Sequence, residues 1–456
     1  MAVEVAPQTS NLARGMRALL AAVGVVGLGA LLLAPTPARR TYPGRTPVRM
    51  WHMWTGEWKD VVDKIVGKFN DSQSRYELVA LSVPTQGADV KLLLAAAGGD
   101  PPDVMAQWNP VIPTWANNGL LTPLDELMTQ EERDRFEREA YPIVKKLGRY
   151  RGHLYGLTIG LNIHACYYRP DHFREAGLDP DRFPTTMEEL VKLGEKLNRF
   201  DSGGNLSRIG FLPKDFRHMA PLFGGGFFNW ETGDLTIRTE PNLRALSFLT
   251  GERKKLGFAN VVRFESGLNT GGFSVEWPFI SGSYSILIDG QWRVEQVGKF
   301  APNLEYRVAP IPPPAGGRKM SGWSNGNFMV IPKAARQREG AWEFVKFWSG
   351  LTQPERAAEF YTMGGWLPLS PTIAAAPKYQ EYLRKYPQFR TFLEVLPSEN
   401  IQPLPPVPYQ VFLMDGIKRT EDSAVRGTLS PEEALAKLDN DLSREQARRK
   451  EIGYAE

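Results

Sequence analysis

The stretch over residues 155–178 constrains this chain most, because its pattern changes from strand to helix within a few residues. Its first half alternates apolar and polar residues, the period of a half-buried strand, and a mostly apolar run continues it to Tyr168. Pro170 suits the first turn of a helix, where its missing N–H would have no partner in any case. Gly177 is a typical C-terminal glycine of that helix. The stretch therefore predicts a strand that turns directly into a helix.

Upstream of this stretch, strands and helices alternate. Residues 48–54 and 76–83 have the composition of strands, whereas 58–69 and 88–97 have the features of helices. This β-α-β-α order favours a mostly parallel sheet with helices on both faces. Because 456 residues are too many for one simple core, we expect two lobes.

Polar and aromatic residues follow two of the predicted strands. Trp54 ends the first strand, and Gln107, Trp108 and Asn109 end the strand that begins at Val104. Ligands of open α/β sheets lie beyond the carboxyl ends of the strands. These residues are therefore candidates for binding a ligand.

Residues 167–178, YYRPDHFREAGL, resemble the "YYNKD-x-F-x-x-AGL" segment of the extracellular solute-binding proteins of ABC transporters, the family that includes maltose-binding protein. Arg169 and Pro170 replace the usual Asn-Lys pair, which is a local change. Further stretches that resemble motifs of this family lie at 98–104 (GGDPPDV), 119–125 (GLLTPLD), 183–190, 284–292, 321–332, 363–368 (MGGWLP) and 430–435. The set over 321–368 is the most specific, and similar matches cover nearly the whole chain beyond its N-terminus.

The resemblance implies an α/β fold of the type II periplasmic-binding-protein class, in which crossing hinge strands join two α/β lobes and a ligand cleft lies between them. It places lobe 1 over 45–162 and lobe 2 over 163–320. The chain then returns to lobe 1 over 321–375, and to lobe 2 and C-terminal helices over 376–456. Two lobes joined in this way can close about a hinge and bury the ligand.

The family's cleft segments and the tryptophans near predicted strand or loop ends supply the candidate binding residues. Aromatic rings cover the apolar faces of sugars, whereas carboxylate and amide groups pair with hydroxyls. The candidates are Trp54, Gln107, Trp108, Asn109, Asn162, Trp230, Trp277, Asp289, Gln291, Trp292, Trp323, Ser324 and Trp366. Any one tryptophan can instead be a core residue, and Asp289 can instead cap the helix that follows it.

The function implied by the resemblance is that of an extracytoplasmic substrate-binding protein of an ABC importer. It would bind a sugar or oligosaccharide by hinge closure and deliver it to the permease subunits. We expect a monomer with no metal and no cofactor. We also expect no nucleic-acid partner, because a net charge of +4 without a basic cluster is weak for a protein that binds nucleic acid. The alternative is a carrier for glycerol-3-phosphate, another phosphorylated polyol or a short peptide. Phosphate would need a dedicated cation, for which Arg169 and Arg217 are available.

A secreted glycoside hydrolase is the other class that the sequence leaves open. Its chemistry needs two carboxylates that flank the scissile bond. Those available are Glu57, Asp89, Asp103, Glu276 and Asp289. No spacing pairs them, the five histidines show no metal-ligand spacing, and no G-x-S-x-G motif is present. Ligand binding without product formation would separate the carrier from the enzyme.

The N-terminus has the layout of a secretory signal, with Arg14 and Arg17, an apolar run over 18–34 and a small-residue exit. The run is slightly short for a membrane span, which needs about 20 residues. A cleaved signal peptide and an uncleaved anchor over 1–44 both stay open, and either predicts a periplasmic or extracellular protein. The single cysteine, Cys166, lies in an apolar run and is expected to be a buried, inert thiol.

Overall fold

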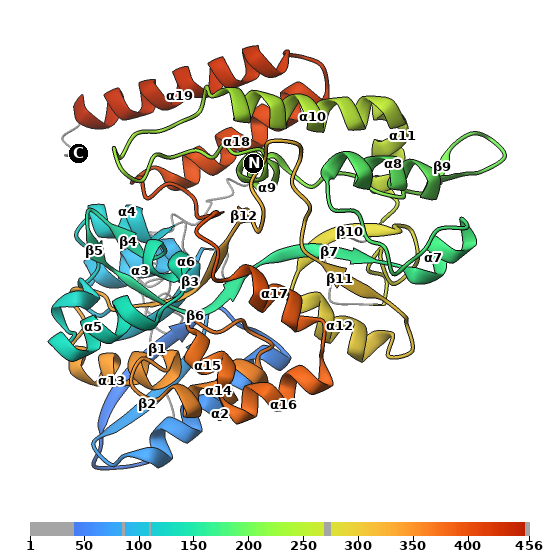
Figure 1. Cartoon of the computed structure of the whole chain (residues 1–456). Helices are drawn as coiled ribbons and strands as arrows, with labels where there is room; N and C mark the ends of the chain where they lie inside the picture. Colours follow the sequence, from blue (N-terminus) through green and yellow to red (C-terminus); the bar gives the residue numbers. More distant parts are fainter. Residues whose placement is uncertain (1–40, 84–86, 109–110, 269–274, 452–456) are drawn as a thin grey trace, which may run out of the picture. The chain divides into compact units, whose positions relative to one another are not determined.

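The computed structural model describes residues 41–83, 87–108, 111–268 and 275–451 (Figure 1). Residues 46–456 form one compact unit, distinct from residues 1–45. The candidate signal or anchor over 1–44 lies almost wholly outside the described residues, as does Asn109, and only the backbone of Trp108 is described. Within the described ranges, no helix combines the length and the apolar character that crossing a bilayer requires.

Three parallel strands form one side of a five-stranded sheet (Figure 1). They are β1 (Thr46–His52), β2 (Tyr76–Ser82) and β3 (Val104–Trp108), joined by α2 (Glu57–Ser72) and α3 (Ala88–Ala97). α2 buries residues three or four apart along one stripe, as an amphipathic helix on a sheet does. The predicted β-α-β-α order is therefore confirmed.

The other side of this sheet is antiparallel. β13 (Asn325–Val330) lies between β3 and β6 (Gly156–Asn162) and runs antiparallel to both. The sheet is thus mixed rather than mostly parallel, because β13 belongs to a segment that returns from far along the chain. We call this sheet and the helices packed on it the first lobe.

A three-stranded antiparallel sheet organises the second lobe. Its order is β10-β7-β11, with β7 (His164–Tyr168) between β10 (Ile286–Gly290) and β11 (Arg307–Ala309). The sequence predicts one continuous strand before the helix at Pro170. The structure instead divides it at Ile163, where the chain passes from the first sheet to the second. The break follows from a side-chain contact, because the Ile163 amide donates to Oε1 of Gln291 (3.1 Å).

The buried apolar side chains form two large clusters, one for each sheet. β7 contributes to both, since its side chains point alternately to opposite faces. Ala165 and Tyr167 join the first cluster, and Cys166 and Tyr168 join the second. Cys166 is fully buried and burial raises the pKa of its thiol, which confirms the expected buried cysteine.

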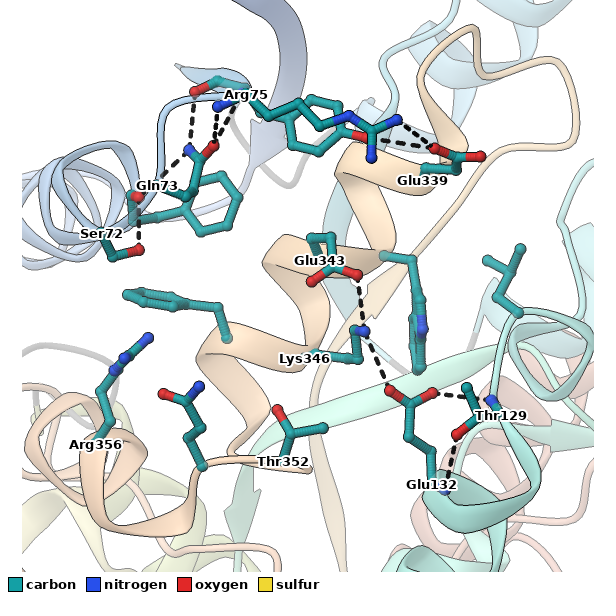
Figure 2. A pocket seen from close by; sticks show the side chains of 16 residues that line it. Ser72, Gln73, Arg75, Thr129, Glu132, Glu339, Glu343, Lys346, Thr352 and Arg356 are labelled. Atoms are coloured by element: carbon teal, nitrogen blue, oxygen red, sulfur yellow. Dashed lines mark hydrogen bonds and ion pairs between the residues drawn. The ribbon is translucent and has the colours of Figure 1, made fainter.

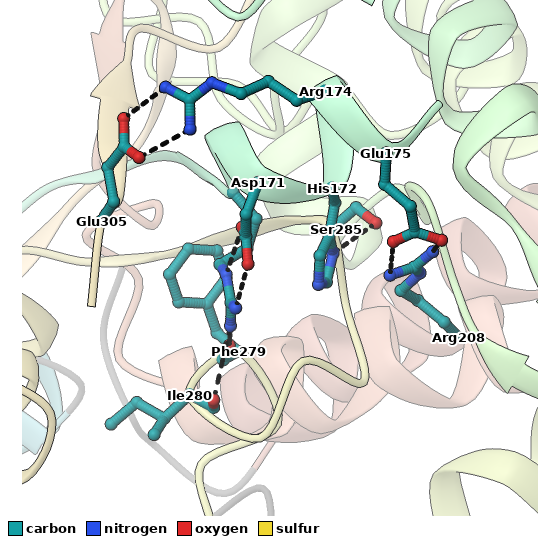
Figure 3. Close-up of polar contacts among 10 residues, drawn as sticks. Asp171, His172, Arg174, Glu175, Arg208, Phe279, Ile280, Ser285 and Glu305 are labelled. Carbon is teal, nitrogen blue, oxygen red and sulfur yellow. Dashed lines mark hydrogen bonds and ion pairs between the residues drawn. The ribbon is translucent and has the colours of Figure 1, made fainter. Parts of the chain in front are cut away.

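The predicted helix after β7 is present as α7 (Pro170–Glu175), and ion pairs hold it in place (Figure 3). Nη1 and Nη2 of Arg174 donate to the two carboxylate oxygens of Glu305 at 2.7 and 2.8 Å. Arg169 pairs with Asp171, with 2.6 Å between Nη2 and Oδ2, and its Nη1 donates to the carbonyl of Phe279. The guanidinium of Arg169 is therefore committed to its own lobe.

Five helices cover the second cluster, and four of them pack directly on one another: α9 (Phe216–Leu222), α10 (Glu240–Leu256), α18 (Gln410–Val425) and α19 (Pro431–Glu451). The fifth, α8 (Met187–Leu197), begins with a capping box of Thr186 and Glu189. Thr185 and Glu188 have the same capping-box spacing in the sequence, but the box forms one residue later. The carboxylate of Glu189 also accepts from the hydroxyl of Thr185, so both threonines serve one acid.

The remaining elements are α4 (Ile112–Asn117), η2 (Leu124–Glu126), α5 (Gln130–Glu139), α6 (Pro142–Lys146), β4 (Arg149–Tyr150), β5 (His153–Leu154), β8 (Arg199–Phe200), β9 (Leu206–Arg208), α11 (Phe258–Ser266), α12 (Trp292–Phe300), β12 (Gly322–Trp323), α13 (Arg338–Ser349), α14 (Pro354–Met363), α15 (Pro371–Ala375), α16 (Pro377–Lys385), α17 (Phe389–Val395) and β14 (Ile401–Gln402).

Candidate functional site

A cavity of about 530 Å³ lies where the ends of the two sheets face each other. We call it the cleft. The first lobe contributes the segment after β1, the start of α2, β13 and the loop after α14, and the second lobe contributes β7, the start of α9 and the start of α12. Its lining residues are Met53, Trp54, Trp58, Asn162, His164, Lys214, Asp215, Arg217, His218, Gln291, Trp292, Trp323, Asn325, Asn327, Gly364, Gly365 and Trp366.

Three tryptophans of the first lobe, Trp54, Trp58 and Trp366, form what we call the aromatic wall. The ring centroid of Trp366 lies 5.6 Å from that of Trp54 and 5.7 Å from that of Trp58. The buried ring of Trp348 stacks behind Trp54 at 5.7 Å. Rings packed in this way hold one another in place, so the wall is preformed.

A glycine on the crossing strand sets the depth of the aromatic wall. Gly160 lies in β6 directly against Trp366, and a Cβ atom at this position would stand 3.0 Å from Cγ of Trp366. Such a contact is shorter than ordinary van der Waals distance. The ring of Trp366 therefore occupies space that any other residue at position 160 would claim in part.

Amide groups form the floor of the cleft, where the chain crosses between lobes. Nε2 of Gln291 donates to the carbonyl of Leu161 (3.0 Å) and to Oδ1 of Asn162 (3.2 Å). The hydroxyl of Ser324 donates to the Asn162 carbonyl (3.0 Å). These bonds join the β6–β7 crossing to the start of α12 and to the β12–β13 crossing, so the floor is also the junction of the hinge segments.

Charged and imidazole side chains of the second lobe form what we call the polar wall, which consists of His164, Lys214, Asp215, Arg217 and His218, together with the ring of Trp323 that packs on Arg217. Asp215 is its centre, because its Oδ1 lies 2.7 Å from Nδ1 of His218 and its Oδ2 accepts from Nη2 of Arg217 at 3.1 Å. The same carboxylate caps α9 by accepting from the backbone amide of His218.

The other members of the polar wall pack around Asp215. The guanidinium of Arg217 lies 4.9 Å from the ring centroid of Trp323, which is cation–π range. Nζ of Lys214 donates to the carbonyl of Ile288 (3.1 Å). The rings of His164 and His218 meet edge to face, with centroids 4.2 Å apart.

The protonation of this wall follows from its surroundings. Burial lowers the pKa of His164 well below its usual value and also lowers the pKa of His218, so both rings are neutral at pH 7. Burial alone would raise the pKa of Asp215, but His218, Arg217 and Lys214 outweigh it and hold that pKa well below its usual value. The wall thus carries two cations and one carboxylate.

The structure brings six of the candidate residues together at the cleft: Trp54, Asn162, Gln291, Trp292, Trp323 and Trp366. The strand-end rule leads to Trp54, and the family motifs lead to the others. Ser324 is 1 % exposed and lies directly behind the floor, where its hydroxyl supports Asn162. Asn109 and the side chain of Trp108 lie outside the described residues.

Two candidates near α12 are turned away from the cleft. Trp277 is 1 % exposed and packs in the first cluster, with the guanidinium of Arg293 4.7 Å from its ring centroid. Asp289 accepts from Nε of Arg293 (2.9 Å) and from the amide of Gly290 (2.8 Å). It neither lines the cleft nor caps α12, whose N-cap residue is Gln291.

Two further candidates are also outside the cleft lining. Gln107 is buried in β3, opposite Phe328 of β13. Trp230 packs edge to face on Phe228, with centroids 5.0 Å apart, in a loop that returns to Leu235. Burial within a sheet and packing within a loop explain these positions.

Sequence reasoning missed several lining residues, chiefly Lys214, Asp215, Arg217 and His218 on one segment, and Asn325, Asn327 and Trp58. A dense run of charged and imidazole residues between apolar segments was the available signal for the first of these. Arg217 was considered only as a phosphate ligand. Trp58 was not recognised as a lining residue because its position also fits the spacing of the buried residues of α2.

A second hollow, of about 620 Å³, lies in the first lobe between α2, α5 and α13 (Figure 2). Most of its charges are paired: Nζ of Lys346 is 2.8 Å from Glu343 and 3.1 Å from Glu132, and Arg75 is 2.9 Å from Glu339, whereas the guanidinium of Arg356 lies 5.0 Å from the ring centroid of Phe347. It contains none of the candidate residues. Elsewhere in the described parts of the chain, no group of three or more His, Cys, Asp or Glu is arranged to hold a metal ion.

The cleft between two α/β lobes defines a solute-binding protein, and the sequence profile of bacterial extracellular solute-binding proteins matches residues 64–391. The chain belongs to this family. Its relatives include the maltotriose-binding protein of Pyrococcus abyssi, 23 % identical over 349 residues that cover 74 % of this chain and 69 % of the relative. They also include the sn-glycerol-3-phosphate-binding periplasmic protein UgpB of Shigella dysenteriae, 22 % identical over 446 residues that cover 92 % and 95 %.

Solved structures confirm the expected fold class, that of type II periplasmic binding proteins. The mannotriose complex of CpMnBP1 superimposes with a TM-score of 0.73 at 26 % identity and covers 86 % of this chain and 99 % of that one. The sugar-binding protein MalE of Xanthomonas citri gives a TM-score of 0.73 at 23 % identity, with 90 % and 100 % covered. The family and these neighbours are binding proteins.

Proposed function

We propose that this protein is the extracytoplasmic substrate-binding component of an ABC importer, and that it binds a sugar or oligosaccharide in the cleft. The observation that carries the proposal is the aromatic wall of Trp54, Trp58 and Trp366, which faces amides and charged groups across one cavity. Relatives named for maltotriose and mannotriose support the same ligand class. A cavity of about 530 Å³ is also within the usual range for small-ligand sites.

The two walls contribute to binding in different ways. The indole faces cover the apolar faces of the sugar rings, and each well-stacked ring contributes about 1–3 kcal/mol by analogy with base stacking. The amides of the floor and the groups of the polar wall pair with hydroxyls. A hydroxyl left without its partner costs about 1–3 kcal/mol, which gives the site its selectivity.

Release and capture require the lobes to move about the floor. We take the lobe boundaries at 162–163 and at 320–321 as part of this proposal, because the chain crosses between sheets beside Ile163 and Ser324. Closure brings α12 against α2, where Nζ of Lys299 lies 2.5 Å from Oε1 of Glu57. Both groups are exposed, so this pair adds little free energy and serves mainly as a contact of the closed form.

Calorimetry tests the proposal directly. A thermal-shift screen of neutral and uronate-containing mono- to trisaccharides selects the ligand, and titration then measures its affinity. Trp54→Ala and Trp58→Ala should each weaken binding about 5- to 150-fold while the protein stays folded. Phe200→Ala, an exposed aromatic residue on β8, is the matched control and should bind as the wild type does. Failure of every saccharide in the panel to bind would refute the proposal.

A carrier of glycerol-3-phosphate is the second candidate, and the UgpB relatives favour it. Of the two arginines available for phosphate, Arg169 is paired with Asp171 in the second lobe, whereas Arg217 lines the cleft. A titration with glycerol-3-phosphate decides between the two, because the proposed sugar carrier should show no heat of binding.

Catalysis is not part of the proposed function. Glycoside hydrolysis needs a second carboxylate beside the bond, and Asp215 is the sole carboxylate among the described lining residues of the cleft. Prolonged incubation with the selected oligosaccharide should return it intact by chromatography. Release of shorter saccharides would overturn this assignment.

Export and partnership complete the proposal. The protein works outside the cytoplasm, in the periplasm or at the cell surface, as a monomer that docks on a membrane permease. The mass of the protein purified from cells distinguishes a cleaved signal from an uncleaved anchor over residues 1–44. Sedimentation tests the monomer, and co-purification from membranes tests the permease.

A further inference from the structure

The charges that line the cleft do not balance. Among the lining residues that the structure describes, Lys214 and Arg217 are cationic and Asp215 is anionic. The nearest other pairs compensate themselves, since Asp289 bonds Arg293 behind the floor and Glu57 bonds Lys299 at the rim. The lining residues therefore carry one more positive than negative charge, and Glu421 of α18, which accepts from the amide of Phe216 and has its pKa raised to about 7, offsets this excess only in part.

The strongest acceptors of the cleft are already used. Oδ1 of Asp215 is taken by His218, and Oδ2 is taken by Arg217. Oε1 of Gln291 accepts from the Ile163 amide (3.1 Å), and Oδ1 of Asn162 accepts from Gln291 (3.2 Å). The acceptors that remain include imidazole nitrogens of the polar wall, because Nε2 of His218 and Nδ1 of His164 have no partner among the described residues and a neutral ring accepts at one of its nitrogens.

Donors, by contrast, remain available. Lys214 has three hydrogens and uses one on the carbonyl of Ile288. Oδ1 of Asn325 is occupied by the Gly326 amide, whereas its Nδ2 has no partner among the described residues. Asn327 is the exception, because its side-chain amide keeps both a donor and an acceptor. The cleft thus presents two cationic donors, Lys214 and Arg217, to a ligand.

We propose that the ligand carries a carboxylate, as in a uronic acid residue, and that Lys214 and Arg217 hold this group against the polar wall. The inference rests on the proposed function, since it specifies the kind of sugar that the cleft takes. A carboxylate accepts hydrogen bonds without donating any and brings one negative charge, which matches the excess of the cleft. A neutral sugar leaves that excess uncompensated when the lobes close.

A phosphate group fits less well than a carboxylate. It carries about −1.5 to −2 charges at pH 7, more than the single excess charge of the cleft. The magnitude of the charge therefore selects the carboxylate over the phosphate.

Matched disaccharides test this inference. Mannobiose and cellobiose are compared by calorimetry with the same linkages in which one C6 hydroxymethyl is oxidised to the carboxylate or carries a phosphate. The carboxylate form should bind about tenfold or more tightly than the neutral form, because it gains charge-assisted hydrogen bonds. Its affinity should also fall as salt rises from 50 to 500 mM, while that of the neutral form should not.

Variants separate the inference from the proposed function. Arg217→Gln and Lys214→Gln should each remove most of the preference for the carboxylate, measured as the ratio of carboxylate to neutral affinity, because a lost charge weakens binding of the anion more than binding of the neutral sugar. Arg138→Gln, an exposed arginine on α5, is the charge control and should keep the full preference. Thermal unfolding checks that every variant is folded.

The outcomes are distinct. A preference for the neutral or the phosphorylated form, or equal affinity for neutral and carboxylate forms, would overturn the inference while the proposed function stands. A preference for the carboxylate that survives both substitutions would overturn the assignment to Lys214 and Arg217. Absence of binding to every form would refute the proposed function as well.

Discussion

The two walls of the cleft are built by different means. The aromatic wall is fixed by packing, because Trp54 and Trp366 rest on each other and on the buried Trp348. The polar wall is fixed by hydrogen bonds that converge on Asp215 at the start of α9. Packing forces are short-ranged and insensitive to pH, whereas the network depends on charge. One wall therefore recognises shape and the other recognises charge, so each can be damaged without the other.

Removal of the central ring should give the largest effect. Trp366 is 4 % exposed and contacts three other indoles, so Trp366→Ala leaves a void in the first lobe as well as a gap in the wall. We expect a loss of about 3–5 kcal/mol in the free energy of unfolding, measured with urea. Trp366→Phe should lose clearly less. If the alanine variant is as stable as the wild type, the packing account of this wall is wrong.

The pH dependence of stability should expose the support of the polar wall. Glu421 of α18 accepts from the amide of Phe216, the first residue of α9 (2.8 Å). Burial, with help from Asp215 and Asp422, raises the pKa of Glu421 from 4.5 to about 7, although Phe216 and Arg253 oppose the shift. The folded state then holds a proton that the unfolded chain has lost, so stability falls as pH rises from 4.5 to 7, by up to about 3 kcal/mol.

Glu421→Gln should abolish this slope, since the amide oxygen can still accept from Phe216 but does not titrate. Urea unfolding at half-unit pH steps measures it. Asp422→Asn, which changes an adjacent acid on the same helix, should keep most of the slope. If the Glu421→Gln variant keeps the wild-type slope of stability against pH, the effect belongs to another group.

A histidine packed beside the aromatic wall should show the opposite trend. His52 is 1 % exposed beside Trp54, with ring centroids 6.0 Å apart, and burial lowers its pKa from 6.5 to about 4. The unfolded chain then binds the proton first, so stability falls as pH drops from 6.5 to 4, by up to about 3 kcal/mol. His52→Leu should remove its share of this acid-side loss and leave the share of His164, His172 and His218, whose pKa values burial also lowers. His153→Leu, at a half-exposed site, should not.

The ion pair of Lys299 and Glu57 at the rim of the cleft should have the smallest effect on binding. Lys299→Gln breaks the pair with Glu57, and both side chains are largely exposed. We expect a change of less than about 1 kcal/mol in binding free energy, with a slightly faster release measured by stopped-flow. Lys437→Gln on α19 controls for the lost charge. A loss comparable to that of the tryptophan variants would mean that the rim, rather than the walls, holds the lobes shut.

Much of the fold was predictable because the relevant patterns are local. The strand and helix of residues 155–178, the alternation over 48–97 and the buried Cys166 follow from period and composition. The antiparallel direction of β13 could not be predicted from local patterns, because it depends on which distant segment fills the gap between β3 and β6. The break at Ile163 was equally hidden, because it depends on Gln291, more than a hundred residues away.

The site was predictable only where position along a strand decides orientation. Trp54 follows β1 and faces the cleft as the strand-end rule requires. Asp289 has an arginine four residues later, Arg293, and this spacing already allowed the ion pair that removes it from the site. Trp277 and the polar wall follow no period, and their direction is set by loops that the tertiary packing orders.

Because residue 160 is a glycine, a substitution there can move the ring of Trp366 without replacing any residue that lines the cleft. Alanine there would press on Trp366 by a few tenths of an ångström, and so move an indole plane without replacing any group that meets the guest. One added methyl group behind the aromatic wall would thus change which thickness of sugar ring the cleft accepts. Engineering of new preferences in this scaffold has a natural starting point there.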